Sequence, residues 1–201
     1  MDLRFDQEII LQLVEPGSRI LDLGCGDGLL LETLAQRKQV KGFGVEISHD
    51  GIQSCMARGL SVQQADIDQG LSDYYKDDSF DYVILSYTLQ AVYKPRLVIE
   101  EMLRVGKKGI VSFPNFGYWK NRMSLVVQGR MPVNEVLPHA WYETPNIHMC
   151  TLDDFKGLCQ LMKLGILEEI PVAANGQPMR GALGKKFANL MAPMAVYLLQ
   201  D

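Results

Sequence analysis

The sequence of 201 residues lacks the features that mark several large classes of protein. Lysine and arginine number 20 against 24 aspartates and glutamates, for a net charge of −4, so no basic face of the size that nucleic-acid binding needs is available. The most apolar stretch, residues 187–199, contains an asparagine and a proline, and it is shorter than the about 20 apolar residues of a membrane-spanning helix. A small basic cluster, Arg180, Lys185 and Lys186, lies among glycines, and we interpret it as a solvated loop. The sequence therefore predicts no nucleic-acid partner and no membrane span.

Cysteine is scarce, and its spacing is not that of a metal or redox motif. No C-x-x-C pair occurs among the four cysteines, which are Cys25, Cys55, Cys150 and Cys159. Residues 1–5 also lack the apolar core of a signal peptide. We therefore expect reduced thiols, no metal site and a cytoplasmic location.

Short apolar runs alternate with helical segments along the first 115 residues. The first runs end at or close to a glycine or an acid, as buried parallel strands do, and we predict strands at 19–23, 42–46, 61–64, 81–86 and 109–113. Apolar residues at helical spacing lie between them, for example over 29–37 and 96–105. Because parallel neighbours need crossover helices, this rhythm predicts an α/β fold with a doubly wound parallel sheet.

The pattern becomes irregular after Pro114. Residues 114–150 hold both tryptophans and several prolines and histidines, and we predict a partly helical insertion that covers the mouth of the sheet. A helix capped by Thr151 follows, and then two strands at 166–170 and 193–199. These two strands have no crossover helix between them and are expected to pair antiparallel. Residues 1–201 are thus predicted to form a single domain.

The most informative stretch is Asp22-Leu-Gly-Cys-Gly-Asp-Gly28, which follows a predicted strand and opens a helix. Its alternate glycines let the main chain turn tightly and approach a ligand. A dinucleotide fingerprint, G-x-G-x-x-G, places a pyrophosphate on the helix N-terminus, but here the third glycine comes one residue early and Asp27 lies in the loop. Asp27 and Asp22 repel a diphosphate and suit a ligand with a sulfonium and an ammonium. This favours S-adenosylmethionine (SAM) over NAD.

Two further acids follow the next predicted strands. Glu46 lies 20 residues beyond Gly26, the spacing at which a carboxylate accepts both ribose hydroxyls. Asp66 can accept from an adenine amino group, with Ile67 against the ring. Ligands of open α/β sheets bind at the carboxyl ends of the strands, so we expect these acids to lie around one site.

These motifs resemble those of class I SAM-dependent methyltransferases: D-x-G-x-G-x-G at 22–28, the acids at 46 and 66, and F-D-Y-V-I-L-S at 80–86. The resemblance implies strand order 3-2-1-4-5-7-6 with strand seven antiparallel. It also implies a methionine moiety beside the glycines and a site lined by residues 86–89. The residues expected to bind SAM or S-adenosylhomocysteine are Asp22, Gly24, Cys25, Gly26, Asp27, Gly28, Glu46, Ile47, Asp66, Ile67, Ser86, Tyr87 and Leu89.

A second resemblance covers nearly the whole chain. Residues 20–28, Ser-Phe-Pro-Asn-Phe-Gly-Tyr-Trp at 112–119, and the stretch from Leu137-Pro-His-Ala-Trp to Cys150-Thr151 resemble the MetW family of methionine biosynthesis. This resemblance implies association with a homoserine O-acyltransferase (MetX).

Methyl transfer from SAM is an in-line displacement, so the protein mainly aligns donor and acceptor and excludes water. Residues 86–90 contain neither Asn-Pro-Pro-Tyr nor a Pro-Cys nucleophile, which disfavours DNA amines and cytosine carbon as acceptors. The aromatics at 116–119 and 141–142 form either an acceptor-pocket wall or a surface on which a partner docks. Tyr87 and His139 are the catalytic candidates among the polar side chains available, which are Tyr87, Gln90, Asn115, Tyr118, His139, Trp141, Tyr142 and His148.

Three functions therefore stay open. A methyltransferase for a small molecule predicts a closed acceptor pocket beside Tyr87 and His139. A SAM-binding accessory subunit of a homoserine acyltransferase predicts an exposed aromatic patch and no acceptor pocket. A nicotinamide oxidoreductase ranks last, because the glycine spacing disfavours it and no Tyr-x-x-x-Lys pair occurs.

Overall fold

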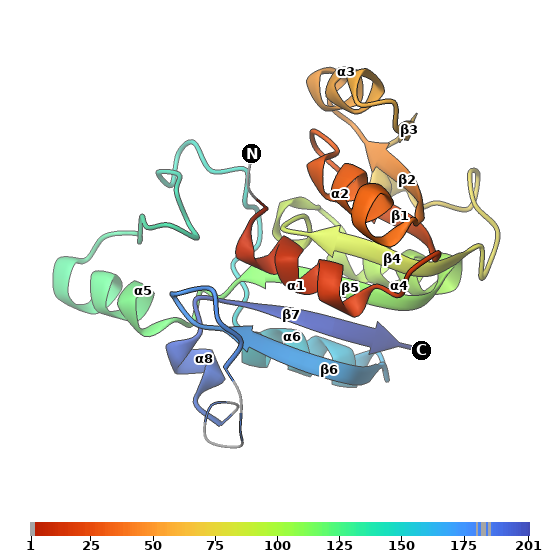
Figure 1. Cartoon of the computed structure of the whole chain (residues 1–201). Helices are drawn as coiled ribbons and strands as arrows, with labels where there is room; N and C mark the ends of the chain where they lie inside the picture. The colour runs from red at the N-terminus through yellow and green to blue at the C-terminus, as the bar shows by residue number, and fades with distance from the viewer. Residues whose placement is uncertain (1–2, 180, 182–183, 185) are drawn as a thin grey trace.

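One seven-stranded sheet of order β3-β2-β1-β4-β5-β7-β6 organises the protein (Figure 1). The computed structural model describes residues 3–179, 181, 184 and 186–201, so Arg180 and Lys185 of the basic cluster lie outside it. β7 runs antiparallel to both β5 and β6, and the other pairings are parallel, which confirms the predicted fold class and strand order. The strands are β1 (Arg19–Leu23), β2 (Lys41–Glu46), β3 (Ser61–Gln64), β4 (Phe80–Ser86), β5 (Gly106–Pro114), β6 (Gly165–Val172) and β7 (Met194–Gln200).

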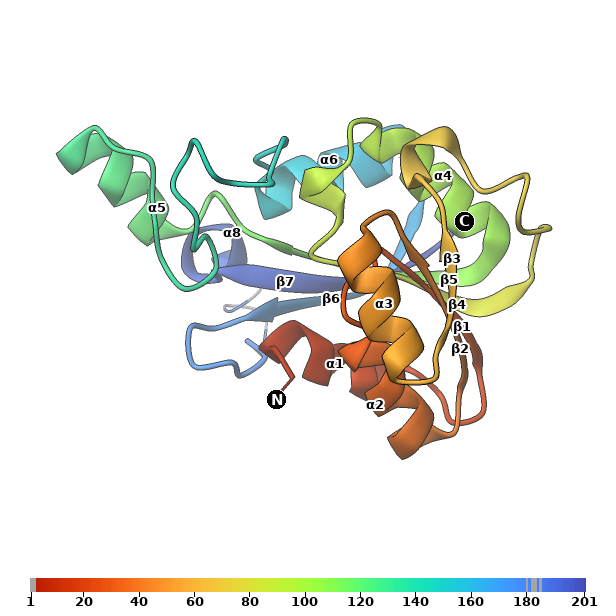
Figure 2. The same cartoon turned by 90° about the horizontal axis from the view of Figure 1, so that it is seen from above.

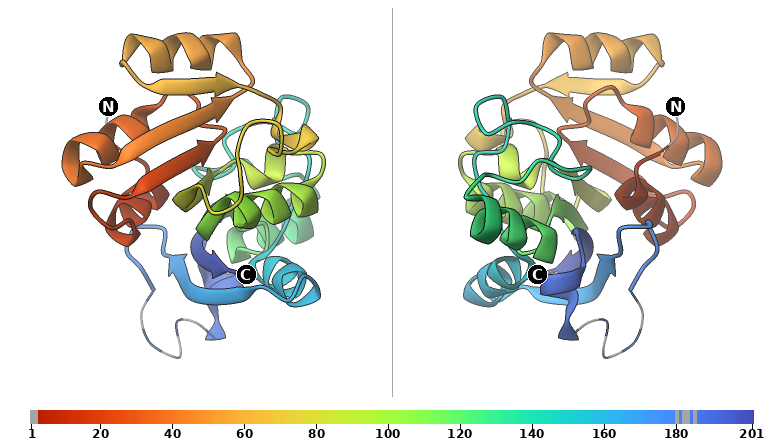
Figure 3. Two further views of the ribbon diagram at one scale, coloured as in Figure 1. Left: turned by 90° about the vertical axis from the view of Figure 1, so that its right-hand side faces the viewer. Right: turned by 90° about the vertical axis from the view of Figure 1, so that its left-hand side faces the viewer.

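Helices cover both faces of this sheet (Figure 2). On one face, α1 (Phe5–Leu13) and α2 (Leu29–Lys38) pack with Ile20, Ile84 and Ile110 of the central strands. On the other, α4 (Pro95–Val105) and α6 (Leu152–Leu161) pack with the alternate strand residues. α3 (His49–Ala57) lies beside β3 at one end of the sheet, and β6 forms the opposite end (Figure 3). The two-residue period of each strand therefore decides which side chains meet α1.

The segment predicted as an insertion, 114–150, contains a short helix and much irregular chain. α5 (Trp119–Met123) continues into a π-helical turn, η3 (Ser124–Gln128), and together they project from the body of the protein (Figure 1). The chain then returns to η2 (Leu89–Ala91), where the Gln90 carbonyl accepts hydrogen bonds from the amides of Ile147 (2.8 Å) and His148 (3.0 Å). A further helix, α8 (Ala188–Met191), precedes β7. None of the helices in the described part of the chain is long and apolar enough to cross a membrane.

Three buried aromatic rings join α6 to the sheet. The ring centroid of Phe155 lies 4.9 Å from that of Phe113 in β5 and 4.7 Å from that of Tyr197 in β7. Because all three side chains are fully enclosed, they fix the position of α6 over the antiparallel end of the sheet.

Replacing Phe155 by alanine is expected to lower the free energy of unfolding by about 3–5 kcal/mol, because it removes a large buried side chain and leaves a cavity. Urea denaturation measures this change. Leu161→Ala in the same helix is the matched control: Leu161 is 69% exposed, and its removal should change stability by less than about 0.5 kcal/mol. Equal losses in the two variants would contradict the role assigned to the aromatic cluster.

Candidate functional site

The glycine loop between β1 and α2 exposes its main chain at one position. Gly24, Gly26 and Gly28 all have positive φ, at 74°, 56° and 79°. A Cβ at Gly24 would lie 2.7 Å from the Thr88 side chain, and one at Gly28 would lie 2.5 Å from Leu60, so packing alone requires glycine at both. A Cβ at Gly26 would meet nothing within 4 Å. Gly26 is thus where a ligand can approach the backbone.

Glu46, at the end of β2, holds this loop in place. Its Oε2 accepts a hydrogen bond from the Gly26 amide (2.8 Å), and its Oε1 accepts from the amides of Ile47 (2.9 Å) and Ser48 (2.8 Å). A carboxylate oxygen has more than one acceptor position, so this buried side chain can still accept from a hydroxyl at its open side. Glu46, the residue predicted to bind the ribose, therefore also anchors the glycine loop.

Asp22 of β1 is the unsatisfied group of the site. Its carboxylate is buried, and Oδ1 has no hydrogen-bond partner among the described residues. Burial raises the pKa of Asp22 to about 7; Arg4 opposes this shift, whereas Glu46 and Asp6 add to it. Within the same described residues, the other buried side-chain oxygen without a partner is Oε1 of Gln90, which belongs to η2 in the loop after β4. One unpaired acceptor on β1 and another in the loop that follows the neighbouring strand fit a ligand that brings a donor, such as an ammonium.

The remaining predicted cofactor residues have varied surroundings. Asp27 faces outward, where its carboxylate pairs with Arg58 (3.1 Å), so its charge is largely offset. The Asp66 carboxylate is half-buried and accepts from the amide of Asp68 (2.9 Å). Ile47 is 63% exposed, beside Glu46. Ile67 packs partly against the core, and Leu89 is buried in η2.

Cys25 is the predicted site residue whose side chain faces the core. Its thiol lies 3.7 Å from the Cys55 sulfur, and burial raises its pKa well above the usual range. Any contact from Cys25 to a ligand would therefore come from its main chain. No cysteine forms a disulfide among the described residues, and no group of three metal-ligating side chains gathers there.

A buried polar network at the start of α1 was not foreseen from the sequence. The Asp6 carboxylate is fully buried, and it accepts hydrogen bonds from Ser86 Oγ (2.7 Å) and Ser112 Oγ (2.7 Å). Arg4 bonds to Asp6 through Nε (3.1 Å) and to Ser86 Oγ through Nη2 (2.7 Å). We call these four residues the clasp, because they tie α1 to β4 and β5. The two serines lie 80 and 106 residues from Asp6 in the sequence, so no local motif marks this network.

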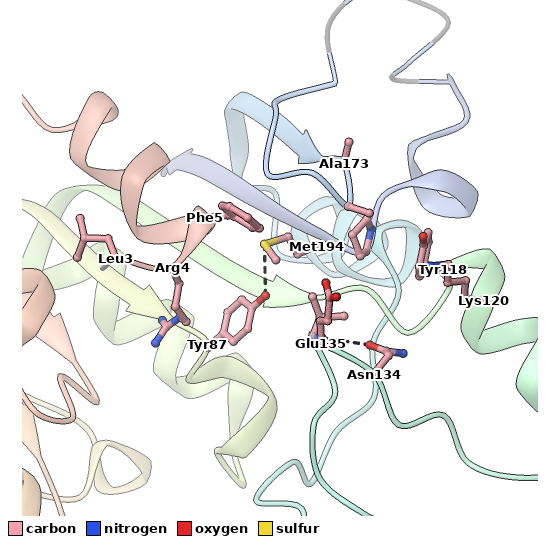
Figure 4. Close-up of a pocket in the computed structure, with 13 residues that line it drawn as sticks. Leu3, Arg4, Phe5, Tyr87, Tyr118, Lys120, Asn134, Glu135, Ala173 and Met194 are labelled. Atoms are coloured by element: carbon pink, nitrogen blue, oxygen red, sulfur yellow. Dashed lines mark hydrogen bonds between the residues drawn. The ribbon is translucent and has the colours of Figure 1, made fainter. Parts of the chain in front are cut away.

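A cavity of about 530 Å³ lies beyond the clasp (Figure 4). Its walls come from the N-terminal segment, the insertion, the residue after β4 and the start of β7, and they include Arg4, Tyr87, Tyr118 and Met194. Tyr87 has a φ of 56°, donates its hydroxyl to the Met194 sulfur (3.3 Å) and lies 4.9 Å beneath the Arg4 guanidinium. Because burial raises the pKa of Tyr87, its phenol stays protonated near neutral pH. The side chain is suited to position a ligand and not to remove a proton.

The structure does not bring His139 to this cavity. His139 is exposed and lines a separate hollow of about 30 Å³ with Trp141. The pocket predicted beside both Tyr87 and His139 is therefore present at Tyr87 alone. His148 is also exposed, and the Asn115 amide is committed to the backbone carbonyls of Asn189 and Ala192.

The aromatic residues of the insertion divide between the inside and the surface. Tyr118 is buried and lines the cavity, and Phe116 is half-buried. In contrast, Trp119, Trp141 and Tyr142 are 40%, 71% and 69% exposed. Tyr118 therefore has the position that a pocket wall requires, whereas Trp119, Trp141 and Tyr142 have the exposure that a docking surface requires.

Comparison with known proteins assigns the sequence to one family. The family described as methionine biosynthesis protein MetW matches residues 4–199. The bifunctional methionine biosynthesis protein MetXA/MetW of Rhodopirellula baltica is 38% identical over 177 residues, which are 84% of this chain and 28% of that protein. The chain thus spans little more than a quarter of that relative. A phosphatidylethanolamine N-methyltransferase of Cereibacter sphaeroides is 26% identical over 80% of this chain and 76% of its own.

Solved structures show the same fold. A SAM-dependent methyltransferase from Mesorhizobium loti superposes with a TM-score of 0.69 at 16% identity, covering 98% of both chains. A methyltransferase from Haloferax volcanii, solved in complex with the activator Trm112, also has a TM-score of 0.69, at 18% identity over 98% of this chain and 88% of that one. The architecture is that of class I SAM-dependent methyltransferases.

The buried carboxylate of Asp22 predicts a pH-dependent stability. Its pKa in the folded protein, about 7, is above its usual value, so folding takes up a proton between those two pH values. Stability is therefore lost as the pH rises from about 4 to about 7 and Asp22 becomes charged. We expect Asp22→Asn, which mimics the protonated acid, to raise the melting temperature by several degrees at pH 8, at about 2–4 °C per kcal/mol.

Thermal unfolding of the ligand-free protein at several pH values tests this. The two proteins should converge near pH 4, where Asp22 of the wild type is protonated in the folded protein and becomes protonated in the unfolded chain as well. A variant that is less stable than the wild type at pH 8 would show that Asp22 is stabilised by contacts that the ligand-free fold already provides.

Proposed function

The chain belongs to the MetW family of methionine biosynthesis proteins, and from that premise we propose that it binds SAM and S-adenosylhomocysteine and acts together with a homoserine O-acyltransferase. The observation that carries the first part is the orphaned Asp22 carboxylate beside the open backbone of Gly26. A buried acid that the protein leaves unpaired, with a pKa raised by burial, fits a cationic ligand better than a phosphate-bearing one.

The residues at the carboxyl edge fit the parts of SAM in sequence. Glu46 would accept the ribose hydroxyls, Asp66 and Ile67 would hold the adenine, and Gly26 with Asp22 would hold the methionyl end. When bound, SAM supplies a methyl group on a sulfonium, which an aligned nucleophile can attack in line. The chain would contribute alignment and partial exclusion of water, since most of the side chains that line the cavity beyond Tyr87 are apolar or aromatic, with Arg4, Lys120, Asn134 and Glu135 as the polar ones.

The proposed partnership rests on the surface of the insertion. Among the described residues, half of the exposed large apolar side chains lie between 119 and 149. Residues 119–128, which we call the arm, present Trp119, Val126 and Val127 at 40%, 81% and 68% exposure. An apolar patch of this kind on a projecting helix is typical of an interaction surface. The Rhodopirellula relative carries both MetXA and MetW in its name, as one polypeptide. Joining two modules in one chain raises their effective concentration for each other, which suits proteins that work together.

The cavity beside Tyr87 favours a second function, methyl transfer to a small molecule. Its volume of about 530 Å³ is within the range of small-molecule sites. It also extends from the strand ends that would hold SAM, because Tyr87 directly follows Ser86 of β4. An accessory subunit that binds SAM but catalyses no reaction would not need such a cavity.

Calorimetric titration with SAM and S-adenosylhomocysteine tests the cofactor assignment. Glu46→Ala should weaken binding at least about ten-fold, which is about 1.4 kcal/mol, because it removes both the loop anchor and the hydroxyl acceptor. Glu100→Ala is the matched control, since Glu100 is a half-exposed acid on α4 that pairs with Arg96. Wild-type protein that binds neither ligand would refute the proposal.

Co-purification with the homoserine O-acyltransferase of the same organism tests the partnership. The double substitution Val126→Asp and Val127→Asp places two charges on the arm, and it should weaken association about ten-fold or more while SAM affinity stays unchanged. Leu161→Asp, at an exposed apolar position of α6, is the control. Association that survives the arm substitutions would exclude the arm as the contact surface.

Acyltransferase turnover should then be measured across a titration of SAM with the reconstituted pair. If SAM and the partner are coupled, each must change the affinity for the other by the same factor. Methyl transfer to a small molecule by the isolated chain would instead support the second function.

A further inference from the structure

We propose that Arg4, on the segment that leads into α1, binds the carboxylate of the methionyl group of SAM, while Asp22 binds the neighbouring ammonium. This inference rests on the SAM binding proposed above. It goes further by assigning each end of the zwitterion to one side chain, and by making the N-terminal segment part of the cofactor site.

Strand alternation places the required groups on one face of the sheet. Leu21, Leu23 and Leu85 belong to the core under α4 and α6. Asp22 and Ser86 alternate with them along β1 and β4, and so lie on the α1 side, as does Ser112 of β5. The strands β1, β4 and β5 are neighbours. The acid and the two hydroxyls therefore lie at one edge of the sheet, beneath the start of α1.

The clasp holds the Arg4 guanidinium in a defined position with part of it free. Nε bonds to Asp6 at 3.1 Å, and Nη2 bonds to Asp6 at 3.3 Å and to Ser86 at 2.7 Å. The Tyr87 ring supports the group from below at 4.9 Å (Figure 4). Nη1 has no hydrogen bond among the described residues, and the side chain is 48% exposed. A cation fixed in this way loses little conformational entropy when it binds an anion.

The charges around Asp22 match those of the methionyl group. Three acids, Asp6, Asp22 and Glu46, are buried there. Arg4 is paired with Asp6, and its positive charge also opposes the rise in the pKa of Asp22. Asp6 already accepts hydrogen bonds from Arg4 and from two serine hydroxyls, and Glu46 accepts hydrogen bonds from three backbone amides. Asp22 still lacks a cation. SAM carries two positive charges and one carboxylate, so it would supply the cation to Asp22 and the anion to the free side of Arg4.

The alternative is that Arg4 serves only to pair with Asp6 and hold α1. That role would make Arg4 matter equally for every ligand of the site, because it concerns the position of α1 alone. A role in binding the carboxylate makes Arg4 matter only for ligands that possess one. Two natural analogues separate these cases: decarboxylated SAM keeps the ammonium and lacks the carboxylate, and 5′-methylthioadenosine lacks both.

Calorimetric titration of the full chain with SAM and the two analogues tests the assignment. Arg4→Gln should weaken SAM binding about 10- to 100-fold, the value of one charge-assisted hydrogen-bond pair. The same variant should bind decarboxylated SAM within about three-fold of the wild type. Arg4→Lys keeps the charge without the planar fork and should recover part of the loss. Asp22→Asn should weaken both ammonium-bearing ligands and leave 5′-methylthioadenosine unchanged.

Arg96→Gln is the matched control. It removes an arginine of α4 that pairs with Glu100 and lies outside the clasp. The ratio of the affinities for SAM and decarboxylated SAM should stay at the wild-type value. Loss of that ratio in Arg4→Gln alone supports the assignment.

Equal weakening of SAM and decarboxylated SAM by Arg4→Gln would overturn it, and Arg4 would then be a holder of α1. Unchanged SAM binding in Arg4→Gln would overturn it as well. Wild-type protein that binds 5′-methylthioadenosine and decarboxylated SAM as tightly as SAM would refute the assignment while leaving the proposed nucleoside site intact. Wild-type protein that binds none of the three would overturn the proposed function together with this inference.

Discussion

The buried carboxylates of Asp6, Asp22 and Glu46 lie around the glycine loop and the start of α1, and the cost of keeping them from water constrains the structure around them. Asp6 is satisfied by Arg4 and the hydroxyls of Ser86 and Ser112. Glu46 is satisfied by backbone amides of the glycine loop and the start of α3. Of these three acids, Asp22 is the one left with an oxygen that has no partner in the described part of the chain. A fold selected for stability would place an apolar side chain there, so the retained acid is best explained by a ligand that neutralises it.

The sheet could be predicted from the sequence, and so could the grouping of the candidate residues Asp22, Gly26 and Glu46 at one edge of it, because both depend on short-range patterns. Buried strands are apolar and end at glycine or an acid, and the intervening helices force parallel pairing. The acids at 22 and 46 and the loop between 24 and 28 follow from spacing along one chain segment. The strand boundaries were predicted less exactly. β5 begins at Gly106 and not at residue 109, because Lys107 pairs with Asp81 of β4 and Lys108 lies opposite Tyr82 of the same strand.

The features that could not be predicted depend on contacts far apart in sequence. Asp6 reads locally as an ordinary polar residue in the first turn of a helix, and only tertiary packing shows that it is buried against β4 and β5. The pairing of Asp27 with Arg58 likewise joins residues 31 positions apart, so the sequence does not show that Asp27 has a cationic partner of its own. Tyr87 and His139 are both catalytic candidates in the sequence, but they line different hollows of the structure. The chain around His139 is irregular and has no periodic pattern, so its path could not be predicted.

The cavity beside Tyr87 connects the two proposed activities physically. One wall is the N-terminal segment, whose Arg4 belongs to the clasp and is proposed to contact the cofactor. Another wall carries Tyr118 and Lys120, at the base of the arm whose exposed face is proposed to meet the partner. A cofactor that fixes the first wall and a partner that fixes the second would each change the shape that the other encounters. Coupling between SAM and an acyltransferase would then need no long pathway, because both would act on opposite sides of one cavity.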